Sequence, residues 1–186
     1  VPVMLNWTMG AGPLAHAVEV ANLEVVLSSL AFLDRLESVD LHPIHKKLIL
    51  LEEIRDHVSL KSLIQCKLRA RKKASEILRL FGRDQDTGHE TAVVLFTSGT
   101  ESNPQGVPLT HDNLLSNHRA AFPLVELRRR DVMLGSIPPF HSFGLSVAGL
   151  FPLLAGVRIA FYPDPTNGRA LARVCSSWQC TIACAP

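Results

Sequence analysis

Apolar residues recur along this chain in short continuous runs, which alternate with stretches where they return every three or four positions. The first pattern is typical of buried strands, and the second is typical of amphipathic helices. In the first half, strands are predicted at residues 1–5, 24–28 and 47–51, and helices at 13–23 and 30–36. This order predicts an α/β fold with largely parallel sheets flanked by helices.

The same alternation continues in the second half. Strands are predicted at 91–96, 131–138 (with a break at Gly135), 157–162 and 180–185, and helices at 110–122, 144–154 and 169–178. Thr110 is expected to cap the first of these helices, because its side-chain oxygen can accept from an N–H of the next turn. Open α/β sheets bind ligands at the carboxyl ends of their strands. The stretch after residue 96 and the segment around His141 are therefore predicted to lie at the binding edge.

Residues 59–81 are predicted to form one long helix, with Ser59 as its N-cap and Gly82 as its C-cap. The face expected to be buried is apolar: Leu60, Leu63, Ile64, Leu68, Ile77, Leu78 and Phe81. The other side is basic, with Glu76 as its acidic residue: Lys61, Lys67, Arg69, Arg71, Lys72, Lys73 and Arg79. This side is either a solvated face or a docking surface for an acidic partner or an anionic membrane.

A polar stretch without apolar periodicity follows, and residues 83–90 are predicted to be a linker. It divides a first α/β segment, residues 1–82, from a second, residues 91–186. The first residue is Val1 rather than Met, and the last apolar run stops where a strand would lead into its next loop. We therefore expect the chain to be an interior piece of a longer protein.

Composition narrows the class of protein. The chain of 186 residues is 47% hydrophobic and 19% charged, which suits a folded α/β protein and argues against disorder. A net charge of +2 gives no indication of nucleic-acid binding. The most apolar run, residues 143–161, is interrupted by Pro152, Gly156 and Arg158, so it predicts helix, turn and strand rather than a membrane span. Four cysteines without regular spacing fit a reducing cytosol, so we expect a cytoplasmic protein, with any inner-membrane association made by parts outside this chain.

Residues 91–107 run from a buried strand into a loop of small and hydroxylated residues: Thr97, Ser98, Gly99, Thr100, Glu101, Ser102, Asn103, Pro104, Gln105 and Gly106. Glycine permits unusual backbone dihedrals, and successive N–H groups can then form a concave anion site. The loop lacks the Gly-Lys-Ser/Thr ending of a P-loop and the spacing of a dinucleotide-binding fingerprint. By spacing alone, a surface turn and a phosphate site both stay open.

The residues themselves are more specific. Thr-Ser-Gly-Thr at 97–100, followed by Pro104 and Gly106, resembles the phosphate loop of the adenylate-forming superfamily, written Thr-Ser-Gly-Ser/Thr-Thr-Gly-x-Pro-Lys-Gly-Val. Residues 138–145, PPFHSFGL, resemble the Pro-x-Phe-His-x-x-Gly segment of the same superfamily, in the same order along the chain. That superfamily includes acyl-CoA synthetases, luciferases and nonribosomal adenylation domains. The start VPVMLNWTMG, the loop LFTSGTES and the segment FHSFGL are similar to bacterial acyl-acyl-carrier-protein synthetases, some of which are fused to a lysophospholipid acyltransferase.

The resemblance implies an interior part of a large N-terminal domain and a two-step reaction. A fatty-acid carboxylate joins the α-phosphate of ATP, and the acyl group then passes to the thiol of a carrier protein. The implied phosphate-binding residues are Thr97, Ser98, Gly99, Thr100, Glu101, Ser102, Gln105 and Gly106. His141 is implied as the catalytic residue, gating the acyl site, with Phe140, His141, Phe143 and Gly144 against the substrate. Mg²⁺ would accompany ATP on ligands mostly outside this chain, and no metal site is predicted within it.

Two departures from the family pattern bear on this interpretation. Gln105 replaces the loop lysine, and Ser102 replaces the second glycine. A charged donor makes a hydrogen bond roughly twice as strong as a neutral one. Weaker stabilisation of pyrophosphate is therefore expected. A fatty acyl-CoA synthetase and a non-catalytic adenylating domain that binds lipid or a partner remain alternatives. The chain alone is expected to be inactive, because the family's later motifs would follow residue 186.

Other polar residues give weaker signals. His141 itself has a simpler interpretation, as a packing residue beside aromatic side chains. Cys175, Cys180 and Cys184 lack a zinc-type spacing and are expected to be buried free thiols. His42 and His45 are assigned to a surface loop. His111 and His118, about two turns apart on one helix, are expected to be solvated or interfacial rather than metal ligands.

Overall fold

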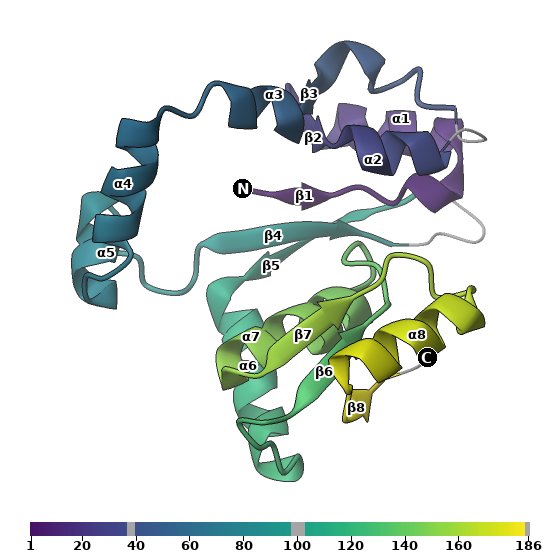
Figure 1. The fold of residues 1–186 in the computed structure, drawn as a ribbon. Coiled ribbons are helices and arrows are strands. Elements are labelled where there is room, and N and C mark those ends of the chain that lie inside the picture. Colours follow the sequence, from purple (N-terminus) through teal and green to yellow (C-terminus); the bar gives the residue numbers. More distant parts are fainter. Residues whose placement is uncertain (37–39, 98–102, 185–186) are drawn as a thin grey trace. The chain divides into compact units, whose positions relative to one another are not determined.

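The computed structural model describes residues 1–36, 40–97 and 103–184, and the chain folds as two compact units (Figure 1). The first unit contains residues 1–6, 91–97 and 105–184 of the described part, and the second contains residues 7–90 with 103–104. Both units combine helices with largely parallel sheets, which confirms the α/β prediction. The predicted division of the chain at residues 83–90 stays a prediction.

A three-stranded sheet of the first unit carries the predicted phosphate loop. Its order is β1 (Val3–Met4), β4 (Thr91–Phe96) and β5 (Gly106–Thr110). β1 runs parallel to β4, and β5 runs antiparallel to β4, with Phe96 opposite Gly106. The sequence did not predict β5, because Gly106 and Pro108 are poor strand formers. Proline is tolerated here because β5 is an edge strand, where the missing N–H breaks no ladder hydrogen bond.

The second sheet of this unit is parallel throughout, in the order β7 (Arg158–Phe161), β6 (Val132–Gly135) and β8 (Ile182–Ala183). From β6 the chain crosses to β7 on one side, and from β7 it crosses back past β6 to β8 on the other side. Because such crossovers are right-handed, reversing direction moves the connecting helix to the opposite face. Figure 1 accordingly shows α7 (Phe151–Ala155) behind the sheet and α8 (Gly168–Trp178) in front of it. The carboxyl end of β6 therefore lies where the strand order reverses.

The helices of the first unit begin and end close to their predicted positions. α6 spans His111–Ala121, and the Thr110 hydroxyl accepts from the Asn113 N–H at 3.1 Å, which confirms the predicted cap. A short 3₁₀ helix, η4 (Phe122–Leu124), follows it. The predicted helix at 144–154 is divided into a π-helix, η5 (Gly144–Leu150), and α7. Gly156 ends α7 with a φ of 70°, the left-handed conformation that glycine adopts without strain.

The second unit is built on a parallel pair of short strands, β2 (Val26–Ser28) and β3 (Leu48–Leu50). Its helices include α1 (Ala11–Val20), α2 (Leu30–Leu33) and α3 (Leu51–Asp56), with 3₁₀ turns η1 (Trp7–Met9), η2 (Asp34–Leu36) and η3 (His45–Lys47). Leu14, Ala17, Val18, Leu36 and Ile44 are its buried apolar residues. The strands and helices predicted between residues 13 and 51 are confirmed with shifted bounds. α1 begins two residues earlier than predicted, and the helix predicted at 30–36 ends as the 3₁₀ turn η2.

The prediction of one helix at 59–81 is wrong. α4 (Leu60–Arg69) and α5 (Ala74–Leu80) are separate helices, and every residue of α4 is exposed, so the predicted buried face is wrong as well. The apolar stripe of α4 would continue three and four residues after Leu68, at Arg71 and Lys72. Like charges four residues apart, such as Arg69 and Lys73, also oppose a continuous helix. The predicted N-cap is confirmed, since the Ser59 hydroxyl accepts from the Ser62 N–H. The C-cap of α5 is Phe81 rather than the predicted Gly82, which follows it with a φ of 64°.

Candidate functional site

The predicted phosphate loop is closed at its base by a reciprocal pair of hydrogen bonds. The Thr97 N–H donates to the Gln105 carbonyl at 3.0 Å, and the Gln105 N–H donates to the Thr97 hydroxyl oxygen at 3.0 Å. Ser98, Gly99, Thr100, Glu101 and Ser102 lie outside the described residues. The Thr97 hydroxyl keeps its own proton available for a further acceptor. Both Thr97 and Gln105 are exposed, so the base of the loop is open to a ligand.

The His141 segment follows the carboxyl end of β6, where the strand order reverses. Ligands of open α/β sheets bind at this kind of crevice. The His141 N–H donates to the Pro138 carbonyl at 3.1 Å, and the His141 carbonyl accepts from the Leu145 N–H at 2.9 Å. The backbone of His141 is thus held on both sides. The centroid of its exposed ring lies 4.8 Å from that of buried Phe140, so the imidazole packs against Phe140 and is also accessible to solvent.

Gly144 allows η5 to begin directly against the end of the β6 segment. A Cβ at this position would lie 2.1 Å from the Pro138 carbonyl oxygen and 2.8 Å from that of Ile137. Real Cβ atoms do not approach backbone oxygens this closely, so glycine is required for packing rather than for an unusual φ. The glycine of the Pro-x-Phe-His-x-x-Gly pattern therefore sets how closely the helix approaches the strand end, and with it the position of Phe143.

A cavity of about 270 Å³ lies between β4, β5, α6 and the start of η5. Its lining is mainly apolar: Leu95, Leu109, Asn113, Leu114, Asn117, Ser142, Phe143, Leu145, Ser146 and Val147. The lining joins the last residues of β4, which lead into the phosphate loop, with the segment that carries His141. Of the predicted substrate residues, Phe143 lines the cavity and is 43% exposed. Phe140, His141 and Gly144 are not among its lining residues.

His118 holds together the two helices that form this cavity. Only 2% of the residue is exposed, so it is neither solvated nor a surface group, unlike exposed His111. Its Nδ1 lies 2.6 Å from the Leu114 carbonyl oxygen of α6, and its Nε2 lies 3.1 Å from the Ser146 carbonyl oxygen of η5. The Ser146 hydroxyl is 3.3 Å from the same Nε2. The interfacial option for His118 is therefore the correct one.

The sequence did not point to the polar residues of the cavity. Asn113 and Asn117 lie four residues apart on α6, on the same side as Leu114, and this spacing was the available signal. Asn113 also completes the helix cap, because its side-chain oxygen accepts from the Thr110 N–H at 3.0 Å. Ser142 and Ser146 lie on the opposite wall. The cavity thus presents an apolar body with a few amide and hydroxyl groups, as ligand sites commonly do.

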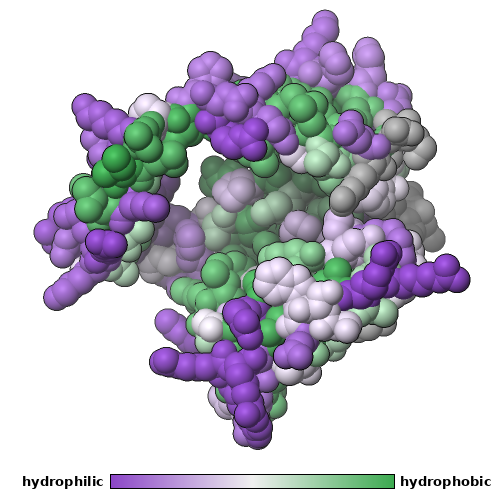
Figure 2. Space-filling view, viewed as in Figure 1, coloured by the Kyte–Doolittle hydropathy of each residue, from purple (hydrophilic) through white to green (hydrophobic). Residues whose placement is uncertain are grey.

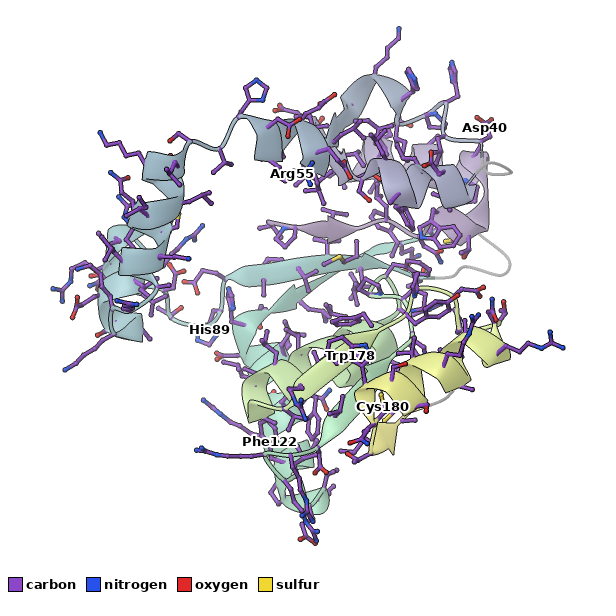
Figure 3. All side chains as sticks on the ribbon, in the orientation of Figure 1. Asp40, Arg55, His89, Phe122, Trp178 and Cys180 are labelled. Atoms are coloured by element: carbon purple, nitrogen blue, oxygen red, sulfur yellow. The ribbon has the colours of Figure 1, made fainter. Side chains whose placement is uncertain are left out.

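The remaining candidates carry no assembled site in the described part of the chain. The cysteines are free, as predicted, but Cys175, Cys180 and Cys184 are half-buried rather than buried. Burial, together with neighbouring Cys175, raises the pKa of the Cys180 thiol, which lies after α8 (Figure 3). His42 and His45 are exposed, as predicted. Within residues 1–36, 40–97 and 103–184, no cluster of three or more His, Cys, Asp or Glu side chains is placed to hold a metal ion.

Comparison of the sequence with protein families assigns the chain to one of them. The profile of the family described as AMP-binding enzyme matches residues 1–186, so the chain belongs to that family. It is 44% identical over 81 residues to the medium-chain fatty-acid–CoA ligase of Escherichia coli (strain K12), covering 41% of this chain and 14% of that enzyme. It is 35% identical over 75 residues to the chloroplastic long-chain-fatty-acid–acyl-carrier-protein ligase of Arabidopsis thaliana, covering 40% and 10%.

Solved structures share the fold across nearly the whole chain. The o-succinylbenzoate CoA synthetase of Bacillus subtilis, in complex with its acyl-adenylate intermediate, matches with a TM-score of 0.70 at 16% identity, covering 98% of this chain and 42% of that one. The same enzyme in complex with ATP and magnesium ion matches with a TM-score of 0.66 at 19% identity, covering 98% and 33%. This chain thus spans less than half the length of each of these relatives.

Proposed function

We propose that the protein carrying this chain activates a fatty acid as an acyl-adenylate, at the expense of ATP, and transfers the acyl group to the thiol of an acyl carrier protein. The observation that carries the proposal is the shared cavity. One wall is the end of the strand that leads into the phosphate loop, and another is the segment that bears His141 and Phe143. A bound acyl chain would thus have its carboxylate near the loop where the phosphates of ATP are held.

The described residues at the base of the loop are compatible with a bound triphosphate. Thr97 and Gln105 bring the two sides of the loop together through backbone atoms. Backbone N–H groups, the Thr97 hydroxyl and the Gln105 amide would hold the β- and γ-phosphates as pyrophosphate leaves. Mg²⁺ would be held by ATP itself and by ligands mostly outside this chain. The neutral Gln105 binds phosphate without offsetting its charge.

His141 is proposed as the residue that contacts the fatty-acid carboxylate and gates the acyl site. Replacing His141 with Ala in the full-length protein is expected to lower acyl-adenylate formation by at least tenfold, measured as fatty-acid-dependent ATP–pyrophosphate exchange. His111→Ala is the matched control, because His111 is also exposed but is not part of the segment. Equal exchange rates in both variants would leave His141 with a packing role.

The thiol acceptor distinguishes the proposal from its nearest rival, a fatty acyl-CoA synthetase. That rival is favoured by the similarity to the CoA ligase of Escherichia coli, whereas the Arabidopsis relative supports a carrier protein. Thioester formation by the full-length protein, measured with holo-acyl carrier protein and with CoA at equal thiol concentrations, separates the two. A higher kcat/KM with CoA would replace the proposal with its rival. A fused acyltransferase is part of the same proposal, and the full-length sequence tests it.

Gln105, which replaces the loop lysine, favours a second rival, a non-catalytic adenylating domain that binds lipid or a partner. Fatty-acid-driven ATP–pyrophosphate exchange by the full-length protein decides between that rival and the proposed enzyme. Gln105→Lys is expected to raise the exchange rate, because a lysine adds a charge-assisted hydrogen bond to the leaving pyrophosphate. Gln105→Met, similar in length and neutral, is its control. A rate that stays the same or falls in Gln105→Lys would show that the position does not act through charge.

A further inference from the structure

The two helices α4 and α5 and the turn between them carry a concentrated positive charge. Seven basic residues lie between Ser59 and Gly82, with Glu76 as the acidic one. Glu76 pairs with Lys72, whose Nζ lies 3.3 Å from its carboxylate, and Arg79 pairs with Asp84 at 3.8 Å. Within the described residues, Lys61, Lys67, Arg69, Arg71 and Lys73 have no ion-pair partner. Their charge is therefore available to an external anion.

The same helices expose large apolar side chains. Leu60 is 73% exposed, Leu68 is 60% exposed and Phe81 is 70% exposed, and Leu63 and Ile64 are also more than half exposed. Figure 2 shows a hydrophobic stripe over α4, flanked by hydrophilic side chains. A helix face that is only solvated is charged or polar all round, whereas a contiguous exposed apolar patch indicates an interaction site.

From this combination we infer that α4 and α5 form a binding surface for an anionic lipid bilayer. Helices that lie in a membrane interface have an apolar face with Leu or Phe, a polar face rich in Lys and Arg, and low overall hydrophobicity. α4 meets each of these conditions. None of the helices in the described part of the chain has the length and hydropathy of a membrane span.

The position of Lys67 favours a bilayer over an acidic protein. Lys67 lies four residues after Leu63 and three after Ile64, so it shares the apolar face of α4. The buried centre of a protein interface is depleted of lysine. At a bilayer, the aliphatic part of Lys67 lies along the apolar layer while its ammonium group reaches the lipid phosphates. The surrounding basic residues then meet the anionic headgroups.

The test is binding of the full-length protein to vesicles, measured by co-sedimentation. Vesicles with about 30% of the anionic lipid phosphatidylglycerol in phosphatidylcholine are compared with vesicles of pure phosphatidylcholine. Binding is expected with the anionic vesicles and is expected to weaken as salt screens the charges. The variant Lys67→Gln, Arg71→Gln, Lys73→Gln is expected to bind on the order of 100-fold more weakly, since each basic residue near the surface contributes about a factor of five.

Matched variants separate this surface from a general effect of charge or hydrophobicity. Arg129→Gln, Arg169→Gln, Arg173→Gln removes the same charge from exposed positions of the first unit and is expected to bind as the unmodified protein does. Leu60→Gln, Leu68→Gln is expected to weaken binding at least tenfold. Leu124→Gln, Leu153→Gln, at positions 84% and 70% exposed, is expected to leave it unchanged. Glutamine is a good helix former, so α4 is expected to persist, and circular dichroism checks this.

Two results would overturn the inference. One is the absence of binding to anionic vesicles by the unmodified full-length protein at low salt. The other is binding that all four variants retain equally, which would place the contact elsewhere. Capture of an acidic protein that depends on Lys67, Arg71 and Lys73, without any vesicle binding, would assign the surface to a protein partner instead.

Discussion

Replacing Gly144 with Ala tests how the His141 segment is positioned. The added methyl group would lie 2.1 Å from the Pro138 carbonyl oxygen and 2.8 Å from the Ile137 carbonyl oxygen. Both contacts are with backbone, and Pro138 is followed by a second proline, so no flexible side chain can move aside. The start of η5 must therefore shift away from the end of the β6 segment. Phe143 would move with it, and the cavity would change shape.

The size of the effect follows from the contact distances. Inserting a methylene into a well-packed site usually costs about 1–3 kcal/mol, and a clash with two carbonyl groups falls at or above the upper end. We expect Gly144→Ala to reduce local stability by about 3 kcal/mol, which raises the equilibrium constant for local opening by roughly 150-fold.

Hydrogen exchange measured by mass spectrometry on the full-length protein gives the local readout. The Leu145 N–H, which donates to the His141 carbonyl at 2.9 Å, is expected to exchange about 100-fold faster in Gly144→Ala. Gly149→Ala is the control on the same helix, because its Cβ would meet the nearest atom, the Gly144 carbonyl oxygen, at an ordinary 3.5 Å. Its exchange should be unchanged or slower, since alanine favours helix. Unchanged exchange in Gly144→Ala would refute the steric argument.

Three further predictions concern other parts of the chain. Hydrogen bonds, chiefly from the Thr87 backbone N–H, hold the pKa of Glu90 at about 2, below its usual value of 4.5. The ionised Glu90 carboxylate therefore stabilises the folded state above pH 4.5, and this stabilisation is lost as the pH falls towards 2. Glu90→Gln should remove that part of the pH dependence of the free energy of unfolding, measured with urea. Thr110→Ala should cost about 1 kcal/mol through the lost helix cap, while Thr110→Ser retains most of it. His118→Ala should cost about 3 kcal/mol through the packing lost where the buried imidazole was and through the loss of its polar contacts with α6 and η5, whereas His111→Ala should stay within about 0.5 kcal/mol in the same urea assay.

Local signals predicted most of the elements that carry the candidate site. β4 appears at its predicted residues, and α6 and α8 begin within one residue of their predicted starts. Thr110 caps α6 as expected, because capping depends on a few adjacent residues. The break between α4 and α5 was also predictable, since Arg71 and Lys72 interrupt the apolar stripe. β5 was not, because only pairing with β4 makes a strand of a segment that contains Gly106 and Pro108.

By itself, the sequence determined the α/β class, the order of the two motifs and the chemistry they offer. Motif residues are adjacent along the chain, and apolar periodicity is a local property, so both can be seen without coordinates. Only the tertiary structure decided that Leu95, Asn113 and Phe143 line one cavity, and that His118 is buried between α6 and η5. These contacts join residues distant in sequence. They depend on strand register and helix packing, which are set by hydrogen bonds and close approach between segments rather than by any one segment's pattern.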